Sequence, residues 1–377
     1  MTSEKYNIPR LQWAGTPYEV GLQHGEQLAP QILDQLAIYR AMFAETCNFD
    51  WARVRETAEE FRATIAHLAP ALLDEMRGIA DGVARGYKTG AWDGPVDAVD
   101  IVALNARSEI ALGQWDDGCT SVAWRVDGSR QLLAQNWDWR ETVGKNLAMA
   151  SITAPGKPRM WMVIEPGIVG KIGFNAASVG VCLNAIRARP ISTSLLPVHL
   201  LLRLALESTS AEGAIRTFER LGGCASSQHI LIADAAGAHG LELSPNGAEY
   251  LKPDADGLLA HTNHFLANTL VDEPPWLEGS RPRLARAYEL CRALRDELGA
   301  EKLPGTVDGA LLRGRVFADT HGGPQAICGR ADPARAAAIQ TLFNIAMDLG
   351  PGHAPTAEVV FGRPGSGEES SVFCMPW

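Results

Sequence analysis

The stretch DDGCTS, residues 116–121, stands between two different sequence patterns and decides the fold. Residues 121–126 are typical of a β-strand, the Asp127-Gly128 pair predicts a tight turn, and residues 131–138 predict the returning strand. Such a hairpin carries the end of the second strand, Asn136-Trp137-Asp138, back to the cysteine of the quoted stretch. We therefore expect the rest of the chain to be arranged around this hairpin.

Before the hairpin, apolar residues recur with the period of an α-helix. This period predicts helical segments at 17–39, 52–68, 70–86 and 97–112. Gly21 and Gly25 fall inside the first segment, where each glycine costs about 1 kcal/mol relative to alanine. We therefore expect a close crossing between this helix and a neighbouring one.

Beyond the hairpin, the period changes to two, which is typical of strands. Paired strands are predicted at 147–154 and 160–164, at 171–175 and 179–185, and at 229–233 and 240–243. Helices are predicted at 198–206, 211–221 and 283–298, and late strands at 337–347 and 358–361. Hairpins alternating with paired helices favour an α+β fold, in which two antiparallel sheets pack between helical layers.

The change of pattern at the hairpin divides the chain into two parts that share a core. We expect a helical N-terminal segment, residues 1–118, and a strand-rich catalytic region, residues 119–377, which together form one compact unit. Residues 266–279, with Pro274-Pro275, predict a surface loop that lies over the site as a lid.

Composition restricts the partners and the compartment. The chain has 377 residues, 46% of them hydrophobic, which is enough to bury a large core. A formal net charge of -10 without any run of Lys and Arg argues against nucleic acid or an anionic membrane as partner. No apolar run approaches the ~20 residues of a membrane span, and residues 1–12 lack the apolar region of a signal peptide. The seven cysteines are scattered and odd in number, which predicts reduced thiols in a cytoplasmic protein.

Cys119 is the candidate nucleophile. A cysteine attacks carbonyl groups as its thiolate and so needs a base nearby. An N-terminal cysteine can use its own α-amino group, whose reference pKa of roughly 7.7–8.0 suits neutral pH. That amine exists only after the Gly118–Cys119 peptide bond is broken, which would yield residues 1–118 and 119–377. We expect Gly118 to assist this step by allowing a strained backbone and by leaving its carbonyl uncovered.

Several short motifs make the sequence familiar when they are taken together and in order. They are Gly15-Thr16-Pro17-Tyr18-Glu19, His24-Gly25, Leu104-Asn105-Ala106-Arg107, Asp117-Gly118-Cys119-Thr120, Gln135-Asn136-Trp137-Asp138, Gly173-Phe174-Asn175, Leu183-Asn184-Ala185, Thr262-Asn263-His264-Phe265 and Ser280-Arg281. Over nearly its whole length the chain resembles the acyl-coenzyme A:6-aminopenicillanic acid acyltransferase family, peptidase family C45, of the N-terminal nucleophile hydrolases. Choloylglycine hydrolases share a similar pattern but carry little sequence before the cysteine.

The resemblance implies the four-layer αββα sandwich of N-terminal nucleophile hydrolases and a role for each matching residue. Cys119 would be the nucleophile and, through its amine, the general base, while Asp138 would hold the amine and the thiol in register. Asn263 would offer its side-chain amide, and Asn184 its backbone N–H, to the oxyanion. Arg281 would support the Cys119–Asp138 pair electrostatically.

The predicted function is a self-processing amidase that hydrolyses a small N-acyl compound through an acyl-thioester on Cys119, without a cofactor. One alternative is an acyl-CoA-dependent N-acyltransferase, and the missing basic patch for coenzyme A phosphates favours hydrolysis over it. A second alternative is an unprocessed binding protein with the Gly118–Cys119 bond intact. The two fragments are expected to stay associated, and the sequence leaves open whether they form a homo-oligomer.

Other interpretations of individual residues also remain open. Arg283 lies two residues after Arg281 and could fill the arginine role instead. His261 and His264 have a spacing that a metal site could use, but no Cys or carboxylate clusters with them in the sequence, so no metal is expected. A papain-like couple of Cys119 with His264 is a further alternative.

Two further segments could belong to the site. Trp115 and Trp139 are close in sequence to the hairpin ends, and we expect them to line an apolar acyl pocket. Residues 167–173 are rich in glycine but lack the Lys-Ser/Thr of a phosphate-binding loop, so they predict a hairpin turn.

Overall fold

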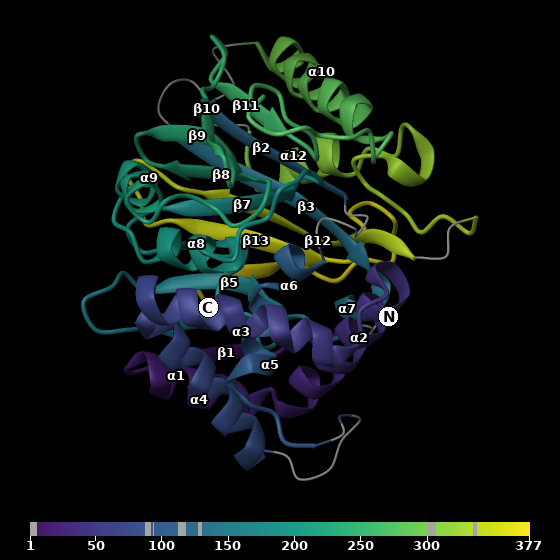
Figure 1. The fold of residues 1–377 in the computed structure, drawn as a ribbon. Coiled ribbons are helices and arrows are strands. Elements are labelled where there is room, and N and C mark those ends of the chain that lie inside the picture. The colour runs from purple at the N-terminus through teal and green to yellow at the C-terminus, as the bar shows by residue number, and fades with distance from the viewer. Residues whose placement is uncertain are drawn as a thin grey trace.

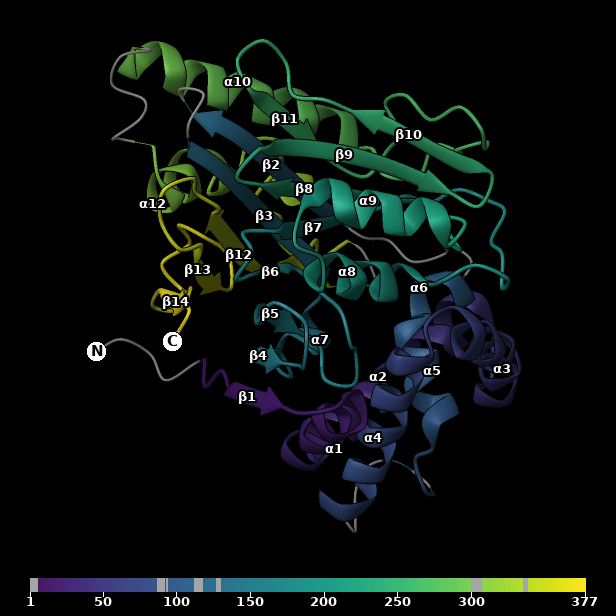
Figure 2. The ribbon, with the colours of Figure 1, turned by 90° about the vertical axis from the view of Figure 1, so that its left-hand side faces the viewer.

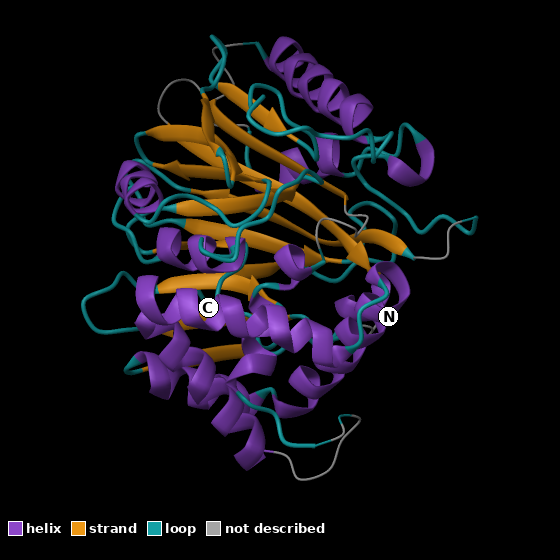
Figure 3. Ribbon diagram, in the orientation of Figure 1, coloured by secondary structure: helices purple, strands orange, loops and turns teal. Residues whose placement is uncertain are grey.

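The computed structural model describes residues 6–86, 92, 94–111, 118–126, 130–299, 307–334 and 338–377. Within these residues, the strands form two sheets that pack face to face, with helices on both outer sides (Figures 1 and 3). The N-terminal helices lie at the opposite end of the molecule from α10 (Ser280–Leu298; Figures 1 and 2). Among the described helices, none combines the length and the apolar character needed to cross a bilayer.

The larger sheet has the strand order β1-β4-β5-β6-β7-β8-β9-β10. Its strands are β1 (Arg10–Ala14), β4 (Ala148–Thr153), β5 (Met160–Ile164), β6 (Gly173–Asn175), β7 (Gly180–Ala185), β8 (Gln228–Asp234), β9 (Gly237–Ser244) and β10 (Gly247–Leu251). The smaller sheet has the order β11-β2-β3-β12-β13-β14. Its strands are β11 (Leu258–His261), β2 (Gly118–Val126), β3 (Arg130–Arg140), β12 (Ile339–Asp348), β13 (Thr356–Phe361) and β14 (Phe373–Met375).

The N-terminal helices are α1 (Pro17–Gln27), α2 (Ala29–Cys47), α3 (Trp51–Leu68), α4 (Pro70–Gly86), α5 (Ala98–Asn105) and α6 (Arg107–Ile110). The later ones are α7 (Glu141–Gly144), α8 (Val198–Leu206), α9 (Ala211–Arg220), α10 (Ser280–Leu298), α12 (Gly309–Leu312), the π-helix η1 (Arg313–Phe317) and the 3₁₀-helix η2 (Gly323–Gln325). Local signals fix several starts: Thr16 and Glu19 form a capping box before α1, and Asp97 caps α5.

The predicted fold class is confirmed, with one exception in the strand directions. Helices α8 and α9 contact β7 and β8 of the larger sheet, whereas α10 and α12 contact β2 and β12 of the smaller one. Among the strands of the described residues, all pairs are antiparallel except β1 with β4, which is parallel. Because β1 belongs to residues 1–118 and β4 to residues 119–377, the two predicted parts share one sheet.

The predicted close helix crossing is confirmed, and it joins α1 to α4. A Cβ added at Gly21 would lie 1.9 Å from the carbonyl oxygen of Glu75, and one at Gly25 would lie 2.1 Å from that of Ile79. Gly78 and Gly82 of α4 approach the backbone of α1 equally closely. Glycine is therefore required at this crossing because the two backbones touch.

Several predicted boundaries were wrong. The first predicted helix is two helices that meet at Leu28, and the fourth is divided at Ala106. Strands β1, β10, β11 and β14 were not predicted. Residues 167–173 do join two adjacent antiparallel strands, β5 and β6, as expected of a hairpin connection. The predicted turn at Asp127-Gly128 lies outside the described residues.

Two hydrophobic cores lie on the two faces of the smaller sheet. On strand β2, Cys119 and Ala123 belong to the large core, which extends through the larger sheet to the N-terminal helices. Val122 and Trp124 belong to a second core beneath α10, α12 and η1. The alternation is that of a strand buried on both faces, and it sets the direction in which each residue of the hairpin points.

Candidate active site

The hairpin of β2 and β3 holds the predicted nucleophile next to the predicted carboxylate. Gly118 pairs with Asp138, and Cys119 pairs with Trp137. Cys119 is buried, with 1% of its surface exposed. The expected juxtaposition of the Gly118–Cys119 bond and Asp138 therefore exists in the folded chain.

The carboxylate of Asp138 is held tightly from several sides. Thr341 Oγ1 donates to Asp138 Oδ1 at 2.6 Å. A Cβ added at Gly118 would lie 2.8 Å from Asp138 Oδ2, and one at Gly329 would lie 3.2 Å from the same atom. Gly118 does not have a positive φ, so the expected strained backbone is not what requires glycine here. Glycine leaves room for the carboxylate, which lies directly against its Cα.

The side-chain amide of Asn263 contacts the main chain of Cys119. The Cys119 N–H donates to Asn263 Oδ1 at 2.9 Å, and Arg283 Nη2 donates to the same oxygen at 2.8 Å. Two donors on one atom identify that atom as the amide oxygen. The amide nitrogen of Asn263 donates to the carbonyl oxygen of Ala185 at 3.0 Å, so both ends of the side chain are fixed.

The arginine that reaches Cys119 is Arg283, and the role expected of Arg281 is corrected accordingly. The guanidinium of Arg283 donates to the carbonyl oxygen of Cys119 and, at 3.1 Å, to Thr120 Oγ1. Arg283 is buried, whereas Arg281 is exposed on the first turn of α10. Residues two apart on a helix point about 200° away from each other, so only one of the two can face the cysteine.

The side chain of Asn184 takes part in a hydrogen-bond network between the two sheets. Asn184 Oδ1 accepts from Ser121 Oγ at 2.7 Å and from His229 Nδ1 at 2.9 Å. Its side chain thus links β7 and β8 of one sheet to β2 of the other, and the backbone role expected of it remains a prediction.

Of the two expected pocket tryptophans, Trp139 is described and Trp115 lies outside the described residues. Trp139 is buried and stacks on Trp137, with ring centroids 6.1 Å apart. Because Trp137 is the cross-strand partner of Cys119, both rings lie on the face of the sheet to which Cys119 points. The indole N–H of Trp139 donates to Tyr39 OH at 3.0 Å, which ties these two rings to α2. The pocket role expected of Trp139 stays a prediction.

A buried charge cluster, which the sequence did not predict, lies behind these rings. Glu165 accepts from Lys171 Nζ at 2.6 Å, from Arg107 Nη2 at 2.6 Å and from Tyr39 OH at 2.5 Å. Burial works against ionisation of Glu165, but the two cations outweigh it and lower the pKa of its carboxyl. Lys171 Nζ also lies 3.6 Å from the ring centroid of Trp137, which places a cation behind the indole.

The two histidines that could have suggested a metal or a base have other contacts. His264 Nδ1 lies 2.7 Å from Ser280 Oγ, and burial, followed by the nearby His261, lowers the pKa of His264 to about 4. His261 Nε2 lies 2.9 Å from Glu242 Oε1. Among the described residues, no three His, Cys, Asp or Glu side chains gather as a metal site.

A pocket of about 350 Å³ opens beside Asn263. Its other walls are His264, Ser280 and Arg281 on one side and the loop residues Glu273, Pro274, Pro275, Trp276, Leu277 and Glu278 on the other. The segment predicted as a lid, residues 266–279, therefore does line a cavity at the site. Arg281 contributes a positive charge to this cavity rather than to Cys119.

The chain is similar to a known family, to a known relative and to a solved structure. Residues 124–343 match the family described as acyl-coenzyme A:6-aminopenicillanic acid acyl-transferase. The acyl-coenzyme A:6-aminopenicillanic-acid-acyltransferase 40 kDa form of Emericella nidulans is 32% identical over 363 residues, which cover 95% of this chain and 94% of that protein. Penicillin V acylase from Agrobacterium tumefaciens is a solved structure with 13% identity and a TM-score of 0.36, covering 68% of this chain and 85% of that one.

The match over residues 124–343 and the 32% identical relative define the class of protein as an acyltransferase family. The chain belongs to the acyl-coenzyme A:6-aminopenicillanic acid acyltransferase family.

Proposed function

We propose that the chain is a self-processing amidase that cleaves the amide bond of a small N-acyl compound with Cys119 as an N-terminal nucleophile. The observation that carries this proposal is the set of contacts on the Gly118–Cys119 peptide. Asp138 lies against Gly118, Asn263 accepts from the Cys119 N–H, and Arg283 donates to the Cys119 carbonyl. Asn263 and Arg283 contact the main chain of Cys119, whose nitrogen would become a free amine after processing.

Processing would begin when the Cys119 thiol adds to the Gly118 carbonyl carbon. The C–N bond then breaks, the nitrogen takes up the thiol proton, and Gly118 is left as a thioester on sulfur. Water hydrolyses this thioester, which yields the Gly118 carboxylate and restores the thiol. The new amine would keep Asn263 Oδ1 as its acceptor, since its nitrogen already donates there.

Turnover would repeat the same chemistry on an external amide. The α-amine takes the thiol proton, sulfur adds to the amide carbonyl, and the amine returns the proton to the leaving nitrogen. Water then releases the acyl group from Cys119. A donor preset at the developing oxyanion contributes typically ~2.7–4 kcal/mol, and the Asn263 amide and the Asn184 backbone N–H are the groups we assign to it.

The mass of the purified protein under denaturing conditions tests processing directly. We expect two species, residues 1–118 and 119–377, in the wild type and one full-length species in Cys119→Ala. Self-cleavage of the alanine variant would overturn the mechanism. A full-length wild type without amidase activity would leave the fold with a binding function, in which the Gly118–Cys119 bond stays intact.

Acyl transfer to an amine is the second candidate, and it is favoured by the 32% identical relative, which is named as an acyltransferase. Hydrolysis and transfer share every step up to the acyl-thioester and differ in the acceptor. A transferase breaks the thioester down faster when an amine is added and yields the N-acyl product, whereas a hydrolase releases the free acid at a rate independent of the amine.

A further inference from the structure

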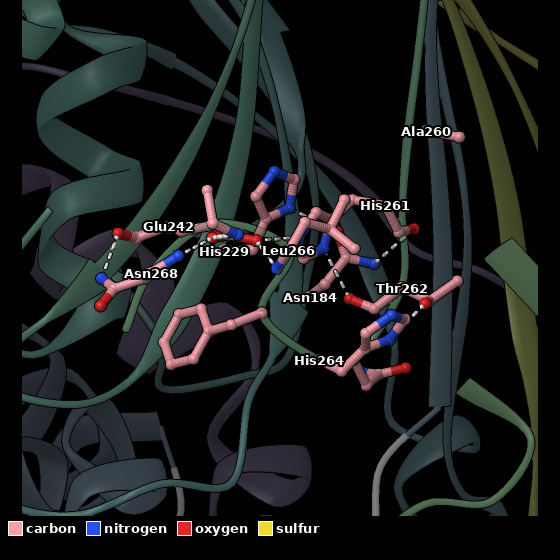
Figure 4. A network of polar contacts seen from close by, with 12 residues as sticks. Asn184, His229, Glu242, Ala260, His261, Thr262, His264, Leu266 and Asn268 are labelled. Carbon is pink, nitrogen blue, oxygen red and sulfur yellow. Dashed lines mark hydrogen bonds and ion pairs between the residues drawn. The ribbon is translucent and has the colours of Figure 1, made fainter. Parts of the chain in front are cut away.

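The buried carboxylate of Glu242, on β9, accepts hydrogen bonds from four donors outside its own strand. Its two oxygens accept from His261 Nε2 at 2.9 Å and from the backbone N–H groups of Leu266, Ala267 and Asn268 at 2.5, 2.9 and 2.7 Å. Figure 4 shows these contacts converging on the carboxylate. Glu242 is 0% exposed, so the protein itself supplies the donors that ionisation of its carboxyl requires.

On one side, Glu242 anchors the start of the loop that lines the pocket. The three N–H groups are consecutive, and the Asn268 side chain adds a further bond to the backbone oxygen of Glu242 at 2.9 Å. The same loop continues to Glu273–Glu278, the residues opposite Asn263 in the 350 Å³ cavity. The position of this pocket wall therefore depends on the Glu242 carboxylate.

On the other side, Glu242 reaches the turn that carries Asn263. His261 ends strand β11, and its Nδ1 lies 2.8 Å from the carbonyl oxygen of Thr262. The next residue in the chain is Asn263, whose own N–H donates to Ser280 Oγ at 2.8 Å. Figure 4 shows His261 lying between Glu242 and the Thr262–His264 turn.

The stacking of two histidine rings keeps His261 in place. The rings of His229 and His261 lie 3.4 Å apart and nearly parallel, and His229 Nδ1 lies 2.9 Å from Asn184 Oδ1. The imidazole of His261 thus has Glu242 and Thr262 at its two nitrogens and His229 on one face. Because the ring is held at both nitrogens, a shift of the Glu242 carboxylate would also shift the turn at Thr262.

Ionisation of Glu242 is favoured in this environment. Burial opposes the charge, but His261 and the N–H groups of Leu266 and Ala267 outweigh it, so the pKa of the Glu242 carboxyl is lowered. Glutamine in its place would lose the charge and would turn one acceptor oxygen into a donor NH₂ group, which would face donors.

We propose that Glu242 is a positioning residue that fixes the pocket loop and the oxyanion residue Asn263 together, through the N–H groups of 266–268 and through His261. The inference rests on the proposed function, because it assigns a catalytic role to Asn263. In this arrangement the pocket wall and the catalytic amide cannot shift independently of each other.

Two variants and a matched control test the proposal. Glu242→Gln removes both links, and His261→Gln keeps a donor for Glu242 but is expected to lose the bond to Thr262. Glu249→Gln is the control, because Glu249 is the cross-strand partner of Glu242 on β10 yet is exposed. Hydrogen–deuterium exchange of peptides covering 261–264 and 265–270 is measured beside kcat and KM for an N-acyl substrate.

The expected results separate the two links. Glu242→Gln should raise exchange in both peptides and lower kcat about 10²-fold, the cost of a misplaced catalytic group. His261→Gln should raise exchange at 261–264 and lower kcat with little change of KM, while residues 265–270 stay protected. The control should resemble the wild type.

Other outcomes would overturn the proposal. Faster exchange at 265–270 with unchanged exchange at 261–264 and unchanged kcat in Glu242→Gln would refute the coupling, as would unchanged exchange in both peptides. If Glu242→Gln does not fold, unchanged kcat and exchange in His261→Gln would refute the link to Asn263. An inactive wild type would refute the proposed function, and with it the catalytic consequence, while the exchange data would still decide whether Glu242 anchors both segments.

Discussion

Replacing Gly118 by alanine should slow self-cleavage without removing any polar group of the site. The added Cβ would lie 2.8 Å from Asp138 Oδ2, whereas ordinary contact begins at 3.4 Å, so the two atoms must separate by 0.6 Å (3.4 minus 2.8). Such a shift disturbs the 2.6 Å bond between Thr341 Oγ1 and Asp138 Oδ1. A displacement of about 1 Å in a reacting group costs roughly 10²-fold in rate, so we expect cleavage to slow by about 10- to 100-fold.

The assay is a time course of intact mass after rapid purification, with the fraction of full-length chain fitted to a single rate. Gly314→Ala is the matched control, because an added Cβ there meets no described atom within 4 Å. After cleavage, residue 118 is the last residue of the N-terminal fragment, whereas the nucleophile belongs to the fragment 119–377. Cleaved Gly118→Ala protein should therefore turn over substrate with the kcat of the wild type. Cleavage of Gly118→Ala at the wild-type rate would refute the reasoning.

Three further predictions follow from the contacts. Arg283→Gln should lower kcat about 10²-fold because it removes charged donors to the Cys119 carbonyl and to Asn263, and an equal loss in Arg281→Gln would contradict the assignment. Gly78→Ala should lower the free energy of unfolding by about 3 kcal/mol, the upper end of the usual cost of overpacking, because its Cβ would lie 2.2 Å from a carbonyl oxygen of α1; urea denaturation measures this. Stability should also fall as the pH drops from 6.5 towards 4, because the unfolded chain binds protons on histidines whose pKa burial lowers in the folded state. These histidines are His24, His199, His229 and His264. Each of them makes the free energy of unfolding fall by up to about 1.4 kcal/mol per unit of decreasing pH. Equal free energies of unfolding at about pH 7 and about pH 5 would refute this prediction.

The parts of the fold that could be predicted from the sequence are those fixed by local signals. Helix α4 begins at Pro70 and ends at Gly86, as its first-turn proline and terminal glycine indicate. The hairpin of β2 and β3 follows from period-two alternation. The break between α1 and α2 was missed because apolar residues continue through Leu28, although Pro30 in the first turn of α2 was a readable sign of a restart.

The choice between Arg281 and Arg283 could not be made from the sequence, for a geometric reason. The predicted helix began at residue 283, whereas α10 begins at Ser280. Because residue 281 lay before the predicted helix, the sequence did not predict which way its side chain points. Side chains two residues apart on a helix point to nearly opposite sides of it. Thr341 was missed for a similar reason, because its contact with Asp138 depends on the register of β12 against β3.

The direction of the side chains on β2 explains why the polar groups of the site contact the main chain of Cys119. Alternate residues of the strand face different cores, so the Cys119 side chain points toward Trp137 and the large core. Thr120, the next residue on β2, and Asp138, the partner of Gly118, belong to the opposite face. Arg283 approaches from that opposite face, where it contacts Thr120. Arg283 and Asn263 are hydrogen-bonded to each other, and together they contact the carbonyl and the N–H of Cys119. Such an arrangement suits the proposed mechanism, in which the base of the nucleophile is its own nitrogen, since the same contacts would orient the amine that the proposed cleavage releases.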